Sequence, residues 1–217
     1  MFDSPLASIF VLAVIVFVGW YALGTQYNVR LGHNALKWLQ KGLPVVGEKA
    51  ALRWLGSSVV ELKIAKAKDP FRSAEVLVVM EPRDVPIMWW LGRARGRRDL
   101  LIFRGQLRSA PHFDLEAQLP KGWAVPDVKH DQTAKWTPVQ GGVANGMRAD
   151  YRGELSPFSV NRLIVAASLD GLTLTRVAVR RAVPNLEVHF LLPKFDQVAT
   201  LRVFTSLRQL SEEVLKL

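Results

Sequence analysis

Arginine is the residue type whose number and spacing point most directly to chemistry in this 217-residue sequence. Four arginines in a stretch of six residues, 93–98, follow the pair Trp89 and Trp90, and further clusters lie along apolar segments. A guanidinium group offers planar, paired donors that match phosphate oxygens. The favourable position of a cation at a helix C-terminus explains one or two arginines, but not four. The residues predicted to bind a polyanion are Arg93, Arg95, Arg97, Arg98, Arg104, Arg176, Arg180 and Arg181.

The overall charge favours the same class of ligand. There are 29 Lys and Arg against 19 Asp and Glu, a net charge of +10, and the first 27 residues hold a single charged side chain, Asp3. Such an excess attracts nucleic acid or anionic lipid headgroups. The sequence has no cysteine, which excludes disulfides, thiolate metal sites and cysteine nucleophiles.

Other catalytic or metal-binding patterns are weak. The sequence contains no P-loop, no GxSxG elbow and no HExxH motif. Two histidines lie near carboxylates that could join them as metal ligands: His112 with Asp114 and Glu116, and His130 with Asp127 and Asp131. Such spacing is common by chance, so solvated loop histidines are the better interpretation, and His189 reads as a structural residue of a strand. We therefore predict no enzyme activity, no metal, no cofactor and no small-molecule substrate.

An apolar segment near the amino terminus predicts a membrane anchor. Leu6 to Leu23 reads LASIFVLAVIVFVGWYAL, without a charge, and its length is close to that of a bilayer-crossing helix. A cleaved signal peptide is the alternative, but no Lys or Arg precedes the apolar run. Residues 1–26 are therefore predicted to be a retained transmembrane anchor.

The charges beside this segment predict its orientation. Basic residues follow the span and none precedes it, which places the amino terminus outside and the bulk of the chain in the cytoplasm. The membrane would be the cell membrane, or the endoplasmic reticulum membrane in a eukaryote. The residues predicted at the membrane interface are Trp20, Tyr21, Arg30, Lys37, Trp38 and Lys41.

A juxtamembrane helical segment is predicted over residues 27–56. An amphipathic helical pattern runs from Tyr27 to Leu55, is interrupted at 42–44, and resumes over Glu48 to Leu55. This pattern fits a helical hairpin or a bent helix. It leaves two alternatives open, contact with lipid and packing on the chain's own domain.

Residues 57–217 predict a basic cytoplasmic α+β domain, because strand and helix patterns are mixed. Strands are predicted over Ser58–Lys66, Ala74–Met80, Leu100–Leu107 and Leu186–Leu192, and a closing helix over Gln197–Leu217. Residues 109–156 are rich in Pro and Gly and predict a long irregular excursion with room for short strands.

The first arginine cluster lies beside a predicted short helix over 84–96. Asp84 is the expected N-cap and Gly96 the expected stop. Apolar residues at helical spacing, Ile87, Trp90, Leu91 and Ala94, predict a stripe that faces the core, so Trp90 should point inward. The arginines would then occupy the turn before the strand at Leu100.

Two stretches resemble the calumin-type family, the coiled-coil-containing subunit of the PAT complex at the translocon. The first is GTQYNVRLGHNALKW, Gly24 to Trp38, which follows a single anchor. The second, within Arg180 to Val214, includes RRAVPNLEVHFLLPKFDQ and VFTSLRQLSEEV. The resemblance implies a basic α/β domain engaged in membrane-protein biogenesis, with ribosomal RNA as the polyanion.

The favoured hypothesis is a single-pass, membrane-anchored binding or scaffold protein that assists membrane-protein biogenesis near the ribosome and translocon. The alternative is an accessory or assembly subunit of a larger integral membrane complex, which contacts acidic partners or anionic lipid. Both hypotheses imply membrane lipid and protein partners. A membrane-bound enzyme that uses residues 109–156 is the least favoured alternative, since no catalytic constellation is present.

Overall fold

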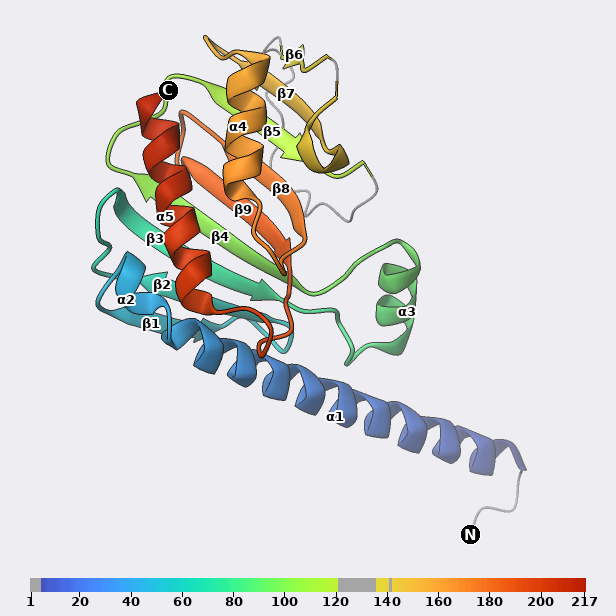
Figure 1. The fold of residues 1–217 in the computed structure, drawn as a ribbon. Coiled ribbons are helices and arrows are strands. Elements are labelled where there is room, and N and C mark those ends of the chain that lie inside the picture. Colours follow the sequence, from blue (N-terminus) through green and yellow to red (C-terminus); the bar gives the residue numbers. More distant parts are fainter. Residues whose placement is uncertain (1–4, 121–135, 141) are drawn as a thin grey trace.

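A large antiparallel sheet forms the centre of the computed structural model, which describes residues 5–120, 136–140 and 142–217 (Figure 1). Within these residues the sheet has nine strands in the order β1-β2-β3-β4-β9-β8-β5-β7-β6, and all neighbours are antiparallel. The strands are β1 (Ala50–Trp54), β2 (Val59–Ile64), β3 (Phe71–Val79), β4 (Leu100–Leu107), β5 (Asp114–Gln118), β6 (Thr137–Pro138), β7 (Arg148–Arg152), β8 (Leu174–Val179) and β9 (Leu186–Leu191).

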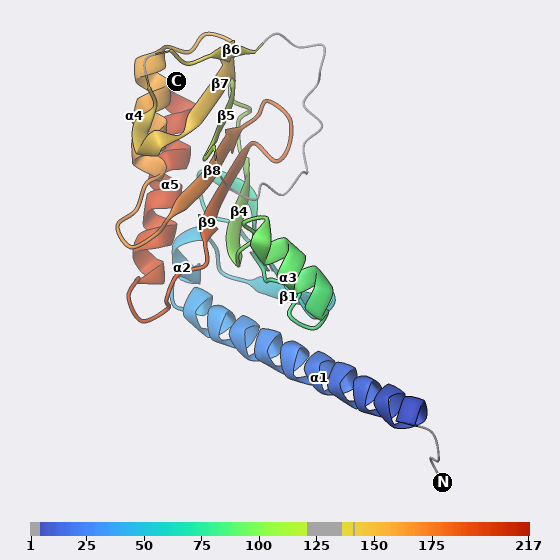
Figure 2. The same ribbon diagram turned by 90° about the vertical axis from the view of Figure 1, so that its right-hand side faces the viewer.

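Helices cover one face of this sheet, and among the described residues no helix lies across the other face (Figures 1 and 2). The helices are α1 (Pro5–Gln40), α2 (Leu43–Val46), α3 (Pro86–Ala94), α4 (Pro157–Ala167) and α5 (Thr200–Lys216), with a short 3-10 turn at Ala144–Gly146. The covering helices are α2, α4 and α5. The fold is therefore a mixed α/β arrangement, as the sequence predicted in its coarse outline.

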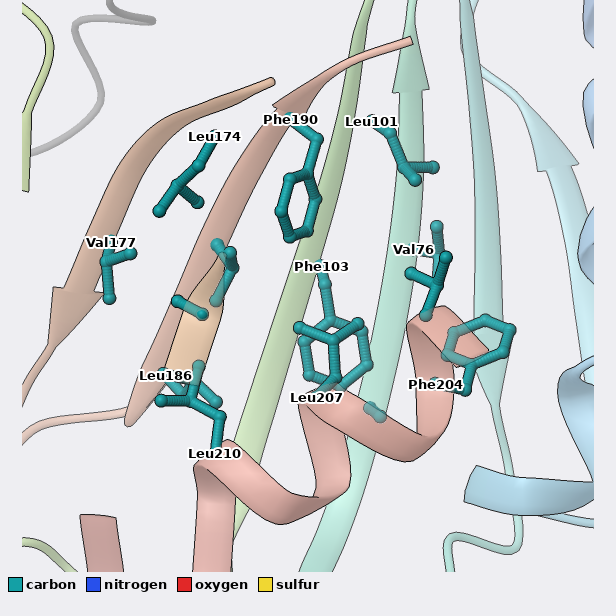
Figure 3. Packing of buried hydrophobic residues seen from close by; sticks show 14 of the residues in the cluster. Val76, Leu101, Phe103, Leu174, Val177, Leu186, Phe190, Phe204, Leu207 and Leu210 are labelled. Atoms are coloured by element: carbon teal, nitrogen blue, oxygen red, sulfur yellow. The ribbon is translucent and has the colours of Figure 1, made fainter. Parts of the chain in front are cut away.

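The core lies between the helix-covered face and α5 (Figure 3). Alternate residues of each strand point to this face, so Leu101 and Phe103 of β4 and Phe190 of β9 are buried there. They meet Phe204 and Leu207 from the apolar side of α5, and the rings of Phe103 and Phe204 lie 6.5 Å apart. Apolar residues recur every two positions in the strands and about every 3.6 positions in α5. The sheet and the helix therefore each present an apolar surface to the other.

Several elements lie where their patterns predicted them. Strand β4 has the predicted bounds, Leu100–Leu107, and β2, β3 and β9 overlap their predicted ranges within a few residues. The closing helix α5 begins at Thr200, three residues after the predicted start. These predictions are confirmed because each of these segments carries its apolar residues at one clear spacing.

The predicted juxtamembrane helices are wrong in part. Helix α1 runs without a break to Gln40, and Glu48 to Leu55, predicted as helix, contains the edge strand β1. Among the described strands, β1 pairs with β2 alone, from Ala50 opposite Ile64 to Trp54 opposite Val60. Four of its five residues are exposed, so the alternation that marks a half-buried strand is absent from its sequence.

The predicted irregular excursion over 109–156 is more ordered than expected. Strands β5 and β7 lie within it and pair with each other from Asp114 opposite Arg152 to Gln118 opposite Arg148. Strand β5 also pairs with β8, which joins this region to the centre of the sheet. Residues 121–135 lie outside the described residues.

Helix α1 has two halves with different surroundings. Apart from half-buried Ala7, its residues from Pro5 to Leu23 are exposed, whereas the half from Gly24 to Gln40 buries one side against the domain. By length and composition, α1 is the one helix in the described part of the chain that could cross a membrane.

Candidate functional site

The candidate site is the junction at which α1 leaves the domain, together with α3 beside it. Gly24, Asn28 and Gly32 lie one helical turn apart on the buried side of α1. A Cβ atom on Gly24 would collide with the carbonyl group of Arg83, and one on Gly32 would collide with the ring of Trp54. The two glycines therefore let the α1 backbone approach the domain more closely than any other residue type would.

Asn28 is fully buried and connects α1 to the segment after β3. Its Nδ2 donates to the backbone oxygen of Glu81 at 3.0 Å and to Oγ of Ser58 at 3.2 Å. Its Oδ1 accepts a hydrogen bond from Arg83 Nη1 at 3.2 Å. Because these donors and acceptors are matched, Asn28 holds α1 in one rotation about its axis.

Arg83 is itself fixed by Asp99, just before β4. Its Nη1 and Nη2 donate to Oδ1 and Oδ2 of Asp99 at 2.9 and 2.7 Å, a paired geometry, and Asp99 Oδ1 also accepts from the Glu81 backbone N–H at 2.7 Å. Burial opposes the charged form of Arg83, but the hydrogen bond and charge of Asp99, with Glu81 and Tyr27, raise the pKa of this guanidinium. Arg83 therefore serves the junction as a permanent cation.

Two tryptophans connect α3 to the same junction. Trp20 Nε1 donates to the backbone oxygen of Arg83 at 2.8 Å, and the rings of Trp20 and Trp89 lie 5.9 Å apart. Trp89 Nε1 donates to Oε2 of Glu81 at 2.6 Å, and Arg93 Nη1 lies 3.3 Å from Oε1 of Glu81. The buried carboxylate of Glu81 thus holds α3 through Trp89 and Arg93. These two side chains define the inner face of the helix, the face toward the domain.

The outer face of α3 corrects the prediction for Trp90. The residues Ile87, Trp90 and Leu91 share one side of the helix as expected, but that side faces away from the domain, and Trp90 is 66% exposed. No residue of α3 is buried. Helical spacing shows that an apolar face exists but does not show what covers it. The prediction that Trp90 points toward the core is wrong for this reason.

The ends of α3 are also informative. Gly96 has φ of 85° and ends the helix as predicted. Asp84 does not cap it, since its carboxylate accepts a hydrogen bond from Ser57 Oγ at 2.5 Å and Val85 occupies the N-cap position.

The arginines after α3 lie mostly at the surface. Arg95 and Arg98 are exposed, and within the described part of the chain neither forms a salt bridge. Arg98 Nη1 donates to the backbone oxygens of Arg93 and Arg97 at 3.1 and 2.6 Å. Arg97 is half-buried, and this burial lowers its pKa against the opposing effect of nearby carboxylates.

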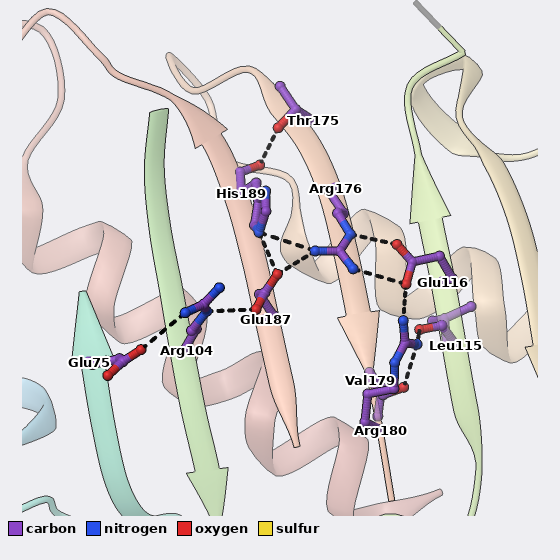
Figure 4. A network of polar contacts seen from close by, with 10 residues as sticks. All are labelled: Glu75, Arg104, Leu115, Glu116, Thr175, Arg176, Val179, Arg180, Glu187 and His189. Carbon is purple, nitrogen blue, oxygen red and sulfur yellow. Dashed lines mark hydrogen bonds and ion pairs between the residues drawn. The ribbon is translucent and has the colours of Figure 1, made fainter. Parts of the chain in front are cut away.

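The arginines of β4 and β8 have different surroundings, on the sheet face without helices. There they alternate with carboxylates across the strands in a row that we call the arginine–carboxylate row (Figure 4): Glu75, Arg104, Glu187, Arg176, Glu116 and Arg180. Arg104 Nε lies 2.7 Å from Glu187 and Arg176 Nε lies 2.5 Å from Glu116. Arg176 also pairs with Glu187, and Arg180 with Glu116.

His189 belongs to this row. Its Nε2 lies 2.6 Å from Oε1 of Glu187. Burial raises the pKa of Glu187, but the hydrogen bond and charge of His189 and the charges of Arg104 and Arg176 together lower it to about 2. The arrangement agrees with the interpretation of His189 as a structural residue.

Three of the arginines predicted to bind a polyanion belong to the arginine–carboxylate row. Arg104, Arg176 and Arg180 each pair with a carboxylate, and Arg176 is only 5% exposed. Arg181 is half-exposed, with Nε 3.7 Å from Asp114. Their binding to a polyanion stays a prediction, while their contacts give the first three a structural role.

The prediction that Trp38 lies at the membrane interface is wrong. Trp38 is 4% exposed and lies in the core, where its Nε1 donates to the backbone oxygen of Val198 at 2.7 Å. Its own backbone oxygen accepts from Thr200 Oγ1 at 2.6 Å. These contacts span about 160 residues of chain, so local sequence could not show them. The other predicted interface residues, Trp20, Tyr21, Arg30, Lys37 and Lys41, are all exposed on or just after α1.

The carboxylates near His112 already have partners. Asp114 pairs with Arg152 at 2.7 Å, and Glu116 belongs to the arginine–carboxylate row. In the described ranges no three His, Asp or Glu side chains gather as a metal site would require. His130, Asp127 and Asp131 lie outside the described residues.

Comparison with known proteins adds no relative to this geometry: no protein-family model matches the chain, and a search of the curated proteins returns no match.

Proposed function

We propose that the chain is a single-pass membrane protein whose basic domain is held rigidly at the cytoplasmic face and acts there as a binding or scaffold module. The observation that carries this proposal is the continuity of α1, whose exposed apolar half passes without a break into a half locked to the domain. Residues 5–23 span roughly 28 Å as a helix, close to the ~30 Å of a bilayer's hydrocarbon core.

The rigid junction distinguishes this arrangement from a simple tether. A flexible linker would let the domain rotate freely above the membrane, whereas Gly24, Asn28 and Gly32 fix α1 against it. The domain therefore presents the same surface to the membrane at all times. Such fixed presentation suits a scaffold that must hold a partner in register with a bilayer.

Two partner classes fit this module. The resemblance to the calumin-type family favours ribosomal RNA near a translocon, with the exposed Arg95 and Arg98 as phosphate ligands. The alternative, an accessory subunit of a larger membrane complex, is supported by the exposed apolar face of α3, because large apolar patches are typical of contact surfaces.

Topology can be measured directly because the chain has no cysteine. Single variants Ser4→Cys and Glu154→Cys would be treated with a membrane-impermeant maleimide, before and after permeabilisation of the cells. We expect Ser4→Cys to react in intact cells and Glu154→Cys only after permeabilisation. Reaction of Glu154→Cys in intact cells, or loss of the chain from membranes on alkaline washing, would refute the proposal.

The rigid junction can be tested with a matched pair of glycine variants. Gly24→Ala places a methyl group against the Arg83 carbonyl and should destabilise the domain by about 1–3 kcal/mol, the usual effect of overpacking. Gly19→Ala meets nothing within 4 Å and should leave stability unchanged. Thermal unfolding in detergent provides the measurement, and equal behaviour of the two variants would argue against a locked junction.

The two partner classes separate by co-purification. Ribosomes that sediment with the solubilised protein, and that dissociate steeply as salt rises, would support RNA as the polyanion. A stoichiometric association with other membrane proteins that resists nuclease and salt would support the accessory-subunit alternative.

A further inference from the structure

Helix α3 exposes an apolar face that the described part of the domain does not cover. Four large side chains, Ile87, Met88, Trp90 and Leu91, are between 40% and 70% exposed. A helix of nine residues gains little stability of its own in water and depends on what it packs against. The face therefore calls for a partner surface outside the domain.

The inner face of α3 determines where that partner must lie. Trp89 and Arg93 are both fastened to Glu81, which is 2% exposed, so α3 cannot turn its apolar side inward without breaking these contacts. The ring of Trp89 also lies against Trp20, in the last turns of the exposed apolar half of α1. Both ribbon views place α3 alongside α1, near the point at which α1 projects from the domain (Figures 1 and 2).

The chemistry of the exposed face matches a membrane surface. Tryptophan, leucine, isoleucine and methionine on one side of a short helix, with arginines at its end, is the composition of helices that lie in the headgroup layer. Arg95 and Arg98 follow this face directly and are exposed. They would meet lipid phosphates while the apolar side chains enter the boundary of the acyl chains.

We infer that α3 is a second membrane contact, which lies in the anionic headgroup layer of the bilayer that α1 spans. The inference rests on the proposed function, since it requires α1 to be a transmembrane helix. With two contacts, one across the membrane and one along its surface, the tilt of the domain is fixed as well as its distance from the bilayer.

The test uses the full chain in lipid nanodiscs that contain only lipid and this protein. Single variants Met88→Cys and Leu91→Cys would carry an environment-sensitive fluorophore, and spin-labelled lipids would report its depth. Leu12→Cys marks the span. Phe158→Cys on α4 is the matched control, because Phe158 is 77% exposed on a helix that covers the other side of the domain.

We expect the labels at 88 and 91 to be quenched by lipids with a shallow spin label, at a depth of about 5–10 Å into the headgroup and acyl boundary. The label at 158 should not be quenched, which excludes insertion driven by the fluorophore itself. Quenching at 12 without quenching at 88 and 91 would overturn the inference and leave the proposed anchor intact. Absence of quenching at 12 by lipids that carry the spin label deep in the acyl chain would overturn the proposed function.

A protein partner predicts a different result. If α3 binds another membrane protein, Leu91→Cys would be protected from aqueous reagents in native membranes but not quenched in lipid-only nanodiscs, and this outcome contradicts the inference. The role of charge is tested by Arg95→Ala/Arg98→Ala combined with the label at 91. Each arginine near an anionic surface should strengthen the contact roughly fivefold, while Arg202→Ala on α5 should change nothing. Quenching that is independent of both arginines and of anionic lipid would overturn the headgroup assignment.

Discussion

Arg95 and Arg98, after α3, are exposed, whereas Arg176 on β8 is 5% exposed and lies between Glu116 and Glu187. All three belong to arginine-rich stretches of the sequence, and all three carry the same charge. What separates them is the neighbouring strand, because β5 and β9 bring the carboxylates of Glu116 and Glu187 to Arg176. Within the described residues, Arg95 and Arg98 form no such ion pair. The arginines that contribute to the net charge of +10 are therefore not equally available to a ligand. The local density of arginines in the sequence does not show which of them are exposed.

The arginine–carboxylate row should show the largest response to loss of a single charge. Glu116→Gln keeps the size of the side chain but leaves Arg176 and Arg180 without a shared carboxylate. Breaking a buried ion pair in this way costs about 3–5 kcal/mol. Chemical unfolding in detergent would measure the loss, with the exposed Glu154→Gln as control, and a loss similar to that of the control would show that the row is not structural.

Acid should weaken the same row. The pKa of Glu187 is lowered to about 2 from 4.5, so its stabilisation is present above about pH 5 and is lost as the pH falls towards 2. The loss should be on the order of 3 kcal/mol. Urea unfolding near pH 6 and pH 3 should show a smaller difference in Glu187→Gln than in the parent chain, and an equal difference would contradict the assignment.

Arg83 provides an intermediate case, since it lies close in sequence to the α3 arginines but is paired with Asp99. Asp99→Asn should remove the charge-assisted part of this bidentate contact and destabilise the domain by roughly 1–3 kcal/mol. Thermal unfolding would measure it beside Asp170→Asn, an exposed aspartate. If Asp99→Asn behaves like that control, Arg83 belongs with the exposed arginines.

The smallest effect on stability is expected for the arginines after α3. Arg95→Ala/Arg98→Ala should change the free energy of unfolding by no more than about 0.5 kcal/mol per residue, as for other surface positions. Arg202→Ala is a suitable reference in the same unfolding measurement. A loss as large as that of Glu116→Gln would remove the distinction between the two groups of arginines.

The sequence predicted those parts of the fold that depend on local spacing. Strand β4 and helix α5 carry regular apolar patterns, and both were placed correctly. The sequence predicts helix where β1 lies, because β1 is an edge strand whose exposed residues show no alternation. The apolar run of α1 is visible in the sequence, but its rigid continuation depends on Gly24 and Asn28 meeting a segment more than 50 residues away.

The candidate site could be predicted only in part for the same reason. The pattern at 87–94 showed an apolar helix face, yet its direction is set by Trp89 and Arg93 on Glu81, a contact between side chains. The pairing of Arg176 with Glu116 joins residues 60 positions apart. One local signal was present, since Arg176 and Ala178 of β8, and Arg180 just after it, alternate with valines. In a strand, residues at this spacing share one face.

Chemical modification of arginine by a dicarbonyl reagent, with the products located by mass spectrometry, would distinguish the exposed arginines after α3 from the buried arginine of the arginine–carboxylate row. The full chain would be compared in detergent and in bilayers that contain anionic lipid. We predict that Arg95 and Arg98 react in detergent and are protected in the bilayer, while Arg176 is protected in both. Equal reactivity of Arg95 and Arg98 in the two environments, or ready modification of Arg176 in the folded chain, would contradict the account.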